Sequence, residues 1–383
     1  MSHGAWRYHD PPMTDSMTLH DRMLAVYRGQ VPDRTPIGIY TRYLPRGTTE
    51  RAVRNTGMGL IEYHPVISML APPWHMYSGY LSEVQGADLE VRYTWDHGVA
   101  AETRSYHTPI GTVSECIRKD PAYGSDWISK FYIESPADYA VMLYLVENTI
   151  FRRNESSIRV HMAELGGDGV VIGRMDRCPY QKLLIELAGP ERFLIDLYTE
   201  PELVLELLEA MDRRMDEAFA MALESEVEVI WQPDNITSDL TPPDMFRKYC
   251  LPYYDKHGRE CRQVEKPYHV HVDGRTRALK DLIATAPIDG IESFSLPIIG
   301  GDLPLHEARA AWPGKTILPN FPSTLCLQAE ADILAFLDNL FADTPVGAPF
   351  MLQVSEDIPP AEWQRVLPIL TTHISERDRG KSP

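Results

Sequence analysis

From about residue 170 onward, one pattern recurs along the chain: a short apolar run, a polar residue at its end, and then a longer segment with helical spacing. The runs read GVVIGRMD, VEVIWQPDN, KPYHVHVDG, IDGIESFSLP, KTILPNFPST and APFMLQVSED. Strands that alternate with helices pair in parallel, because each helix returns the chain to the same end of the sheet. With IGIY near the start and further strands expected between residues 90 and 116, the strands approach eight in number. The sequence therefore predicts an α/β fold, a closed (β/α)8 TIM barrel.

Helical spacing is clear in the segments between these runs, for example in Leu203, Leu207, Leu208 and Met211, which share one face. Residues 41–165 are rich in Pro, Tyr and Trp and form the least regular part of the sequence, so we expect an N-terminal extension and long loops over the barrel mouth. We expect residues 1–383 to form a single barrel domain, with residues 1–16 as a loose tail. The predicted helical segments are 17–28, 200–226, 242–262, 275–286, 303–311, 327–341 and 360–374.

Composition excludes several classes of protein. A formal net charge of −18 over 383 residues, without any basic run, argues against nucleic-acid binding. No apolar stretch approaches the length of a membrane span, and the first residues lack the apolar region of a signal peptide, so we expect a cytoplasmic protein. The five cysteines are scattered without CxxC spacing, which is typical of reduced thiols. Cys178, which follows an apolar run, is the one thiol for which we weigh a functional role.

In a TIM barrel, catalytic residues lie at the carboxyl ends of the strands, so the ends of the apolar runs become candidate site residues. Acidic and imidazole groups from different strands are expected to converge there. For Asp176 and Asn320, capping of the following helix is an equal alternative to a functional role. The candidates are Tyr40, Arg42, Asp176, Cys178, Asp234, Asn235, His271, Asp273, Glu292, Asn320, Ser355 and Glu356.

The run YHVHVDG has two histidines and an aspartate at every second position. In a strand, side chains two residues apart point to the same face, so His269, His271 and Asp273 are expected to share one. A row of this kind suits a metal site. Hydrogen-bonded histidines of a barrel core are an equal alternative from these residues alone.

Several segments, in order, resemble the uroporphyrinogen decarboxylase superfamily over nearly the whole chain. MTLHDRMLAVYRGQVPDRTPIGIY is similar to the opening helix and first strand of that family, with its Asp-Arg-x-Pro entry. YHTPIGTVSE, VENTIF, FRKYCLPYYDKHGREC and IESFSLPIIGGDLPLHEARAAWPGKTILPNFPST resemble later segments. The decarboxylase proper is the weaker match. Only TRYLPRG remains of its tetrapyrrole-binding signature, and the first arginine of that signature is missing.

The cobalamin-linked methyltransferase branch of the superfamily, similar to methylcobamide:coenzyme M methyltransferases, fits better. Those enzymes bind zinc through a His-x-Cys-Gly segment and a Gly-Cys near the C-terminus. Here HVDG matches the first segment, with His271 at the family histidine and Asp273 at the cysteine. MLQVSEDIPP resembles the second segment and puts Glu356 at the other cysteine.

The resemblance thus implies a metal held by His271, Asp273 and Glu356. Two carboxylates in place of two thiolates make such a site harder, so zinc is expected first and Fe(II), Mn(II) or Co(II) are alternatives. His269 is a candidate fourth ligand, partner of a ligand, or substrate contact. A hydrogen-bonded network of His271, Asp273 and Glu356 without metal stays open.

The function implied is a metal-dependent methyltransferase or demethylase that works with a corrinoid on a small O- or N-methyl compound. The chain lacks a corrinoid-binding motif of the Asp-x-His-x-x-Gly type, so the corrinoid is expected as a co-substrate or on a partner protein. A metal-dependent decarboxylase, lyase or hydrolase of a small acid is the alternative. The expected roles are general acid or substrate positioning for Glu292 and Asp234, catalysis or contact with an anionic group for Tyr40, and substrate binding for Arg42, Asn235, His269 and Asn320.

Overall fold

The computed structural model describes residues 17–67, 83–96, 98–119, 126–344 and 348–379. The loose tail expected at residues 1–16 lies outside the described residues, as do residues 68–82 of the segment expected to cover the barrel mouth.

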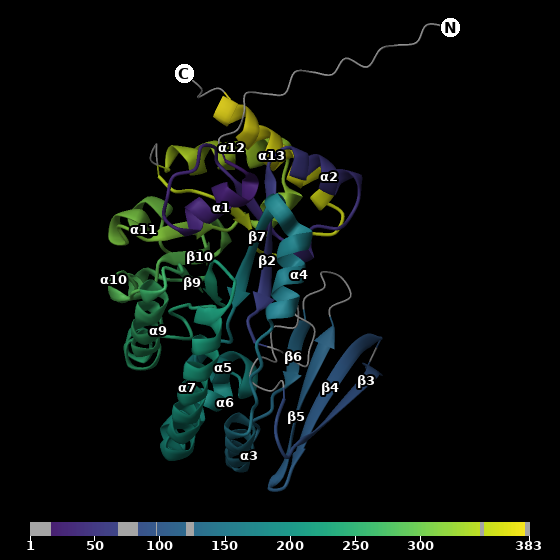
Figure 1. Cartoon of the computed structure of the whole chain (residues 1–383), viewed down its shortest axis with the longest axis vertical. Coiled ribbons are helices and arrows are strands. Elements are labelled where there is room, and N and C mark those ends of the chain that lie inside the picture. The colour runs from purple at the N-terminus through teal and green to yellow at the C-terminus, as the bar shows by residue number, and fades with distance from the viewer. Residues whose placement is uncertain (1–16, 68–82, 97, 120–125, 345–347, 380–383) are drawn as a thin grey trace, which may run out of the picture.

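Eight parallel strands form a nearly closed barrel, which confirms the predicted fold (Figure 1). The circle is completed between the last two strands, where Asn320 bridges Gln353 and the Phe321 N–H donates to the Gln353 carbonyl oxygen over 2.7 Å. In their order around the barrel the strands are β11 (Thr316–Pro319), β10 (Gly290–Phe294), β9 (Tyr268–His271), β8 (Ile230–Gln232), β7 (Gly169–Arg174), β2 (Met58–Pro65), β1 (Ile37–Tyr40) and β12 (Leu352–Val354).

The barrel interior is filled by side chains from alternate positions of the strands. Ile61, Tyr63, Ile172 and Trp231 belong to this inner cluster, and helix α1 (Leu19–Tyr27) contributes side chains to it as well. Helix α1 begins with a capping box, in which the Asp21 N–H donates to the Thr18 Oγ1 over 3.1 Å. A larger cluster fills the space between the strands and the outer helices.

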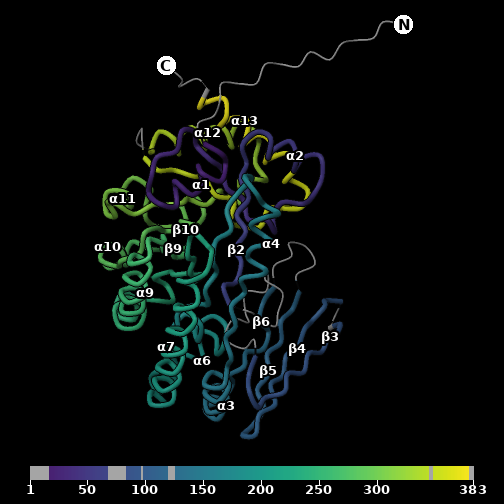
Figure 2. The backbone as a smooth tube through the Cα atoms, viewed as in Figure 1, coloured from purple at the N-terminus to yellow at the C-terminus, as the bar shows by residue number. Residues whose placement is uncertain are grey.

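The helices that follow the strands agree with the predicted segments from residue 200 onward. Figure 2 shows α1, α2 and α13 at one end of the molecule and a small separate sheet at the other. The longer helices are α2 (Thr48–Asn55), α3 (Pro136–Glu147), α4 (Glu155–Leu165), α6 (Pro190–Thr199), α7 (Pro201–Glu224), α9 (Leu251–Gln263), α12 (Glu330–Ala342) and α13 (Trp363–Arg379). The shorter ones include α5 (Pro179–Lys182), α8 (Pro243–Met245), α10 (Lys280–Thr285) and α11 (Leu305–Ala311).

The described part of residues 41–165 is more regular than the sequence suggested. The strands expected between residues 90 and 116 are not barrel strands; they belong to a four-stranded antiparallel sheet next to α3. Antiparallel pairing follows from the tight connection between its middle strands, where Thr108 pairs with Gly111. The barrel strand that the sequence analysis missed is β2. The sheet consists of β3 (Asp88–Asp96), β4 (Val99–Thr108), β5 (Gly111–Lys119) and β6 (Asp126–Lys130).

Among the described residues, none of the helices combines the length and the apolar character that crossing a bilayer requires.

Candidate functional site

At the carboxyl ends of the barrel strands, a fully buried carboxylate joins three other strands. Glu292 on β10 pairs in register with His271 on β9. Its Oε1 accepts a hydrogen bond of 2.5 Å from the Tyr40 hydroxyl of β1. Its Oε2 accepts from the Trp231 Nε1–H of β8 over 3.1 Å and from His271 Nδ1–H over 2.5 Å. Because both oxygens are engaged by side chains, Glu292 holds its neighbours in place.

This arrangement favours the cationic form of His271 in the metal-free protein. Burial opposes the charged imidazole, but Glu292 and Asp273 outweigh it and raise the pKa of His271 to about 10. With Nδ1 bound to Glu292, Nε2 is the nitrogen on the side of Asp273, at 3.8 Å from the Asp273 Oδ2. The Asn235 Nδ2 is 3.5 Å from the same oxygen. The structure therefore brings His271, Asp273 and Asn235 together, while the roles expected for them stay predictions.

Two more carboxylates follow β12. Burial raises the pKa of Glu356; His271 lowers it, and the charges of Asp273 and Asp357 raise it further. Glu356 is thus within electrostatic reach of His271 and Asp273. On the other side, the Arg42 Nη2 is 3.8 Å from the Asp357 Oδ1. Acidic groups from two strand ends meet here beside Arg42.

The sequence analysis did not single out Trp231, Asp357 or Tyr63. The Tyr63 hydroxyl on β2 accepts a hydrogen bond of 3.5 Å from the Arg42 Nη1. Asp357 directly follows a candidate residue, so its position after β12 was a usable signal. Trp231 is inside an apolar run and Tyr63 is on the strand that was missed, so their polar contacts left no signal in the sequence.

Asp234 belongs to a different set of buried contacts. Its Oδ1 accepts from the Cys178 N–H over 2.8 Å, and its Oδ2 accepts from the Tyr254 hydroxyl over 2.5 Å. The carboxylate therefore ties the ends of β7 and β8 to α9. Burial raises the pKa of Asp234 and also that of the Cys178 thiol. The catalytic role predicted for Asp234 stays a prediction, as does a functional role for Cys178.

His269 and Asn320 also make contacts away from His271. The His269 Nε2–H donates over 2.8 Å to the carbonyl oxygen of Tyr27, the last residue of α1. The Asn320 Oδ1 accepts from the backbone N–H and the hydroxyl of Ser355, over 3.1 and 2.9 Å. These bonds join α1 to β9 and β11 to the end of β12. The substrate-binding roles expected for both residues stay predictions.

Asp176 is part of a buried network of charges next to this region. Lys182 on α5 lies 2.9 Å from the Asp176 Oδ1 and also pairs with Glu186. The Arg177 Nε donates to the Glu186 Oε1 over 2.7 Å, and its Nη1 donates to the Asn235 Oδ1 over 3.0 Å. The network thus holds the Asn235 side chain in place through Arg177.

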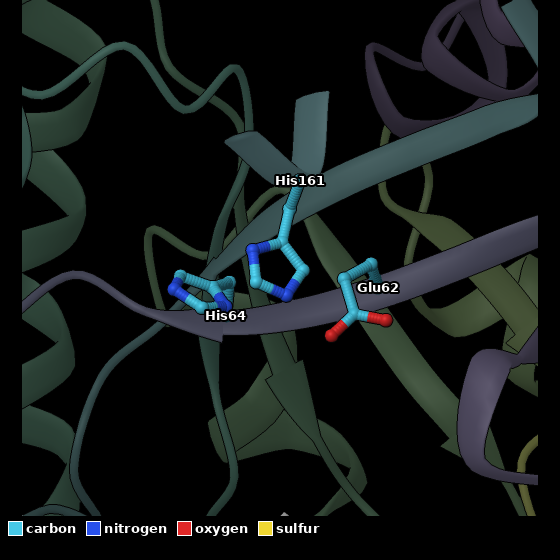
Figure 3. A group of neighbouring side chains, drawn as sticks. All are labelled: Glu62, His64 and His161. Carbon is cyan, nitrogen blue, oxygen red and sulfur yellow. The ribbon is translucent and has the colours of Figure 1, made fainter. Parts of the chain in front are cut away.

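A second group of potential metal ligands lies outside the barrel, and the sequence analysis missed it. Glu62, His64 and His161 each offer one ligand atom, all within 4.8 Å of one another (Figure 3). Within the residues that the structure describes, His271, Asp273 and Glu356 do not meet this spacing. Burial and the neighbouring His161 lower the pKa of His64 to about 4. The metal ligands expected at the strand ends stay a prediction.

The fold and the strand-end residues define a TIM-barrel protein with a polar site at the carboxyl ends of its strands. The family model "Uroporphyrinogen decarboxylase (URO-D)" matches residues 151–333. The match covers a little under half of the chain, and together with the barrel it is consistent with the uroporphyrinogen decarboxylase superfamily.

Two solved structures match this chain, and the first of them supports the likeness of fold. A methyltransferase from Methanosarcina mazei superposes with a TM-score of 0.57 at 14% identity, covering 94% of this chain and 99% of that one. The GH18 chitinase ChiB from the chitin utilization locus of Flavobacterium johnsoniae gives a TM-score of 0.32 at 9% identity, covering 61% of this chain and 82% of that one. A search of curated proteins gave no significant match.

Proposed function

We propose that this chain is a metal-dependent methyltransferase or demethylase that works with a corrinoid on a small O- or N-methyl compound. The observation that carries the proposal is the His271 and Glu292 pair, in which Nδ1 is bound to Glu292 and Nε2 is on the side of Asp273. A metal bound at Nε2 would displace the proton that this nitrogen carries in the metal-free protein. The match to the uroporphyrinogen decarboxylase family model over residues 151–333 and the whole-length likeness of fold to a methyltransferase support it.

The residues at the strand ends fit a divalent cation. Asp273 and Glu356 bring two carboxylates near His271, Glu292 adds a third, and Asp357 lies close to Glu356. Among the described residues, Arg42 is the arginine that pairs with this group, through Asp357. A metal ion offsets such an excess of negative charge. A carboxylate bound to Nδ1 is also the usual partner of a metal-ligating histidine, since it fixes the ring and leaves Nε2 to the metal. His271, Asp273 and Glu356 would hold the ion, which when bound supplies a Lewis acid.

The chain's own residues bind and orient in this proposal. Arg42, supported by Tyr63 and Asp357, supplies the positive charge for an anionic group of the substrate or acceptor. Tyr40 and Trp231 fix Glu292, which fixes His271. A site rich in oxygen ligands favours oxygen or nitrogen compounds over thiols, because hard ligands select harder ions. The corrinoid would come as a co-substrate or on a partner protein.

A decarboxylase, lyase or hydrolase of a small acid is the second candidate. The observation in its favour is Arg42, whose guanidinium can pair with a substrate carboxylate next to the proposed ion. This alternative uses the same side chains, so the reaction product distinguishes the two.

The test is an assay of the metal-loaded protein with methylcobalamin or cob(I)alamin and a panel of methoxylated, folate and thiol compounds. The visible spectrum of the corrinoid reports methyl transfer, and released carbon dioxide is measured in parallel. We expect spectral turnover with oxygen or nitrogen compounds that exceeds turnover with thiols. A fully loaded protein that is inert towards corrinoid but releases carbon dioxide or hydrolyses a small acid would replace the proposal by the alternative.

A further inference from the structure

The outer face of β2 has a polar pair that the barrel does not require. Ile61 and Tyr63 point into the barrel, so Glu62 and His64 point outward, towards helix α4. His161 of α4 packs against this pair, and its ring centroid is 4.2 Å from that of His64. Figure 3 shows His161 between His64 and Glu62. A strand face that packs under a helix is usually apolar, so three polar side chains here need a reason.

Two of the three side chains, His161 and Glu62, are oriented by a neighbour. The His161 Nδ1–H donates over 2.8 Å to the carbonyl oxygen of Ser157, which leaves Nε2 with its lone pair. The Thr41 hydroxyl donates to the Glu62 Oε2, which leaves Oε1. These are the contacts that fix the direction of metal ligands in known sites.

His64 supplies the independent observation. It is fully buried, and within the described residues its Nδ1 has no hydrogen-bond partner. Its Nε2 is 3.1 Å from the side-chain amide of Asn154. The same amide nitrogen also donates over 3.1 Å to the carbonyl oxygen of Pro65. A metal at Nδ1 requires the proton to be on Nε2 and the Asn154 amide to turn over, which exchanges the bond to Pro65 for one to His64. The His64 Nε2–H then donates to the amide oxygen, and Nδ1 has a free lone pair.

We propose that Glu62, His64 and His161 bind a divalent transition metal of the zinc class, at a site separate from His271. The ligands are Glu62 Oε1, His64 Nδ1 and His161 Nε2, a set of two imidazoles and one carboxylate that zinc accepts. Ligand atoms of a tetrahedral zinc ion are about 3.3 Å apart, given bonds of about 2.0 Å. One potential ligand atom of each residue already lies within 4.8 Å of the others, so such a set would close by about 1.5 Å at most on binding. Glu62 and His161 are half-buried and on different elements, which allows this movement.

An entry path exists. Glu62 and His161 line a surface cleft of about 120 Å³, together with Arg46, Arg54 and Glu164. Three protein ligands leave at least one coordination position of the metal, which this cleft makes accessible to water. Because Thr41 begins the short helix that carries Arg42, an ion at Glu62 would also fix the segment beside the strand-end site.

The test uses the full chain after removal of metal by a chelator, with circular dichroism to check the fold, and titration with Zn(II) and Co(II). His161→Ala and Glu62→Gln are made in a His271→Ala background, because this background removes the strand-end site of the proposed function. We expect the background protein to bind one equivalent, and either added change to weaken that binding at least 100-fold. His107→Ala, at an exposed histidine of β4, serves as the matched control and should change nothing.

The outcomes separate the two sites. Equal binding by the background protein and by both double variants would overturn this inference, as would no binding by the background protein. If the background protein and the wild type each bind one equivalent, the strand-end metal fails while this inference stands. Glu62 and His161 are preferred to the buried His64 for substitution, because they are half-buried and their loss disturbs packing less.

Discussion

Replacement of Glu292 by glutamine tests whether this carboxylate controls His271. The change keeps the size of the side chain and removes its charge. Glu292 is the first among the groups that raise the pKa of His271 from 6.5 to about 10. That rise corresponds to roughly 5 kcal/mol at about 1.4 kcal/mol per pH unit. Because burial alone lowers the pKa, we expect the pKa of His271 in Glu292→Gln to fall by about 2 to 3 pH units.

The sign of the effect on stability follows from this shift. A histidine whose folded pKa is raised contributes stability that is fully present below its unfolded pKa of 6.5 and is lost as the pH rises through about 10. The metal-free wild type should therefore lose stability between these values. Glu292→Gln should be less stable than the wild type by roughly 3 to 4 kcal/mol near pH 6, and this difference should shrink towards pH 10.

Denaturant unfolding at pH 6, 8 and 10, with the pKa of His271 followed by NMR, measures both quantities. Tyr40→Phe is the matched control, because it removes the bond to the other oxygen of Glu292 and leaves the charge. In the metal-loaded protein, loss of the histidine's partner should also weaken binding about 10- to 100-fold. A folded Glu292→Gln protein whose free energy of unfolding depends on pH as that of the wild type does would refute this explanation.

The remaining predictions concern the metal and a second buried acid. Alanine at His271, Asp273 or Glu356 should strongly reduce the metal bound at the strand ends, as measured by elemental analysis; undiminished metal in all three variants would remove the proposed site. Changing Asp273 and Glu356 together to cysteine should shift selectivity towards zinc and away from Fe(II) and Mn(II), and competition binding that shows no shift would mean that these side chains do not reach the ion. Burial raises the pKa of Glu115 to about 7, so the folded state loses stability as the pH rises from 4.5 through 7. The free energy of unfolding of Glu115→Gln, measured relative to that of the wild type, should therefore be higher at pH 8 than at pH 4 by up to about 3 kcal/mol. The same difference between the two proteins at both pH values in denaturant unfolding would contradict this.

The barrel was predictable wherever the strands were apolar and followed by helices. Seven of its strands, β1 and β7 to β12, coincide with runs read from the sequence. Strand β2 was missed because the outward Glu62 and His64 interrupt its apolar residues and because Gly57 and Pro65 flank it as turn signals. The strands of the small sheet were counted as barrel strands in place of β2, since alternation of apolar and polar residues alone does not distinguish antiparallel strands from barrel strands.

The site was predictable as a set of strand ends but not as a set of contacts. His271, Asp273, Glu292 and Tyr40 were expected near one another because strand ends converge in a barrel. The sequence could not reveal that Glu292 binds His271 instead of facing substrate, since its partners come from β1 and β8. The group around His161 depends on how α4 packs on β2, which no local pattern encodes.

The central claim is that His271 at the strand ends carries methyl transfer. Single-turnover demethylation of methylcobalamin, followed by its visible spectrum, tests it with the wild type, His271→Ala and the control His306→Ala, whose imidazole is exposed. We predict a loss of at least about 100-fold in His271→Ala, in line with the removal of a group on which the reaction depends, and wild-type rates in the control. Wild-type rates in a folded His271→Ala protein would contradict the account.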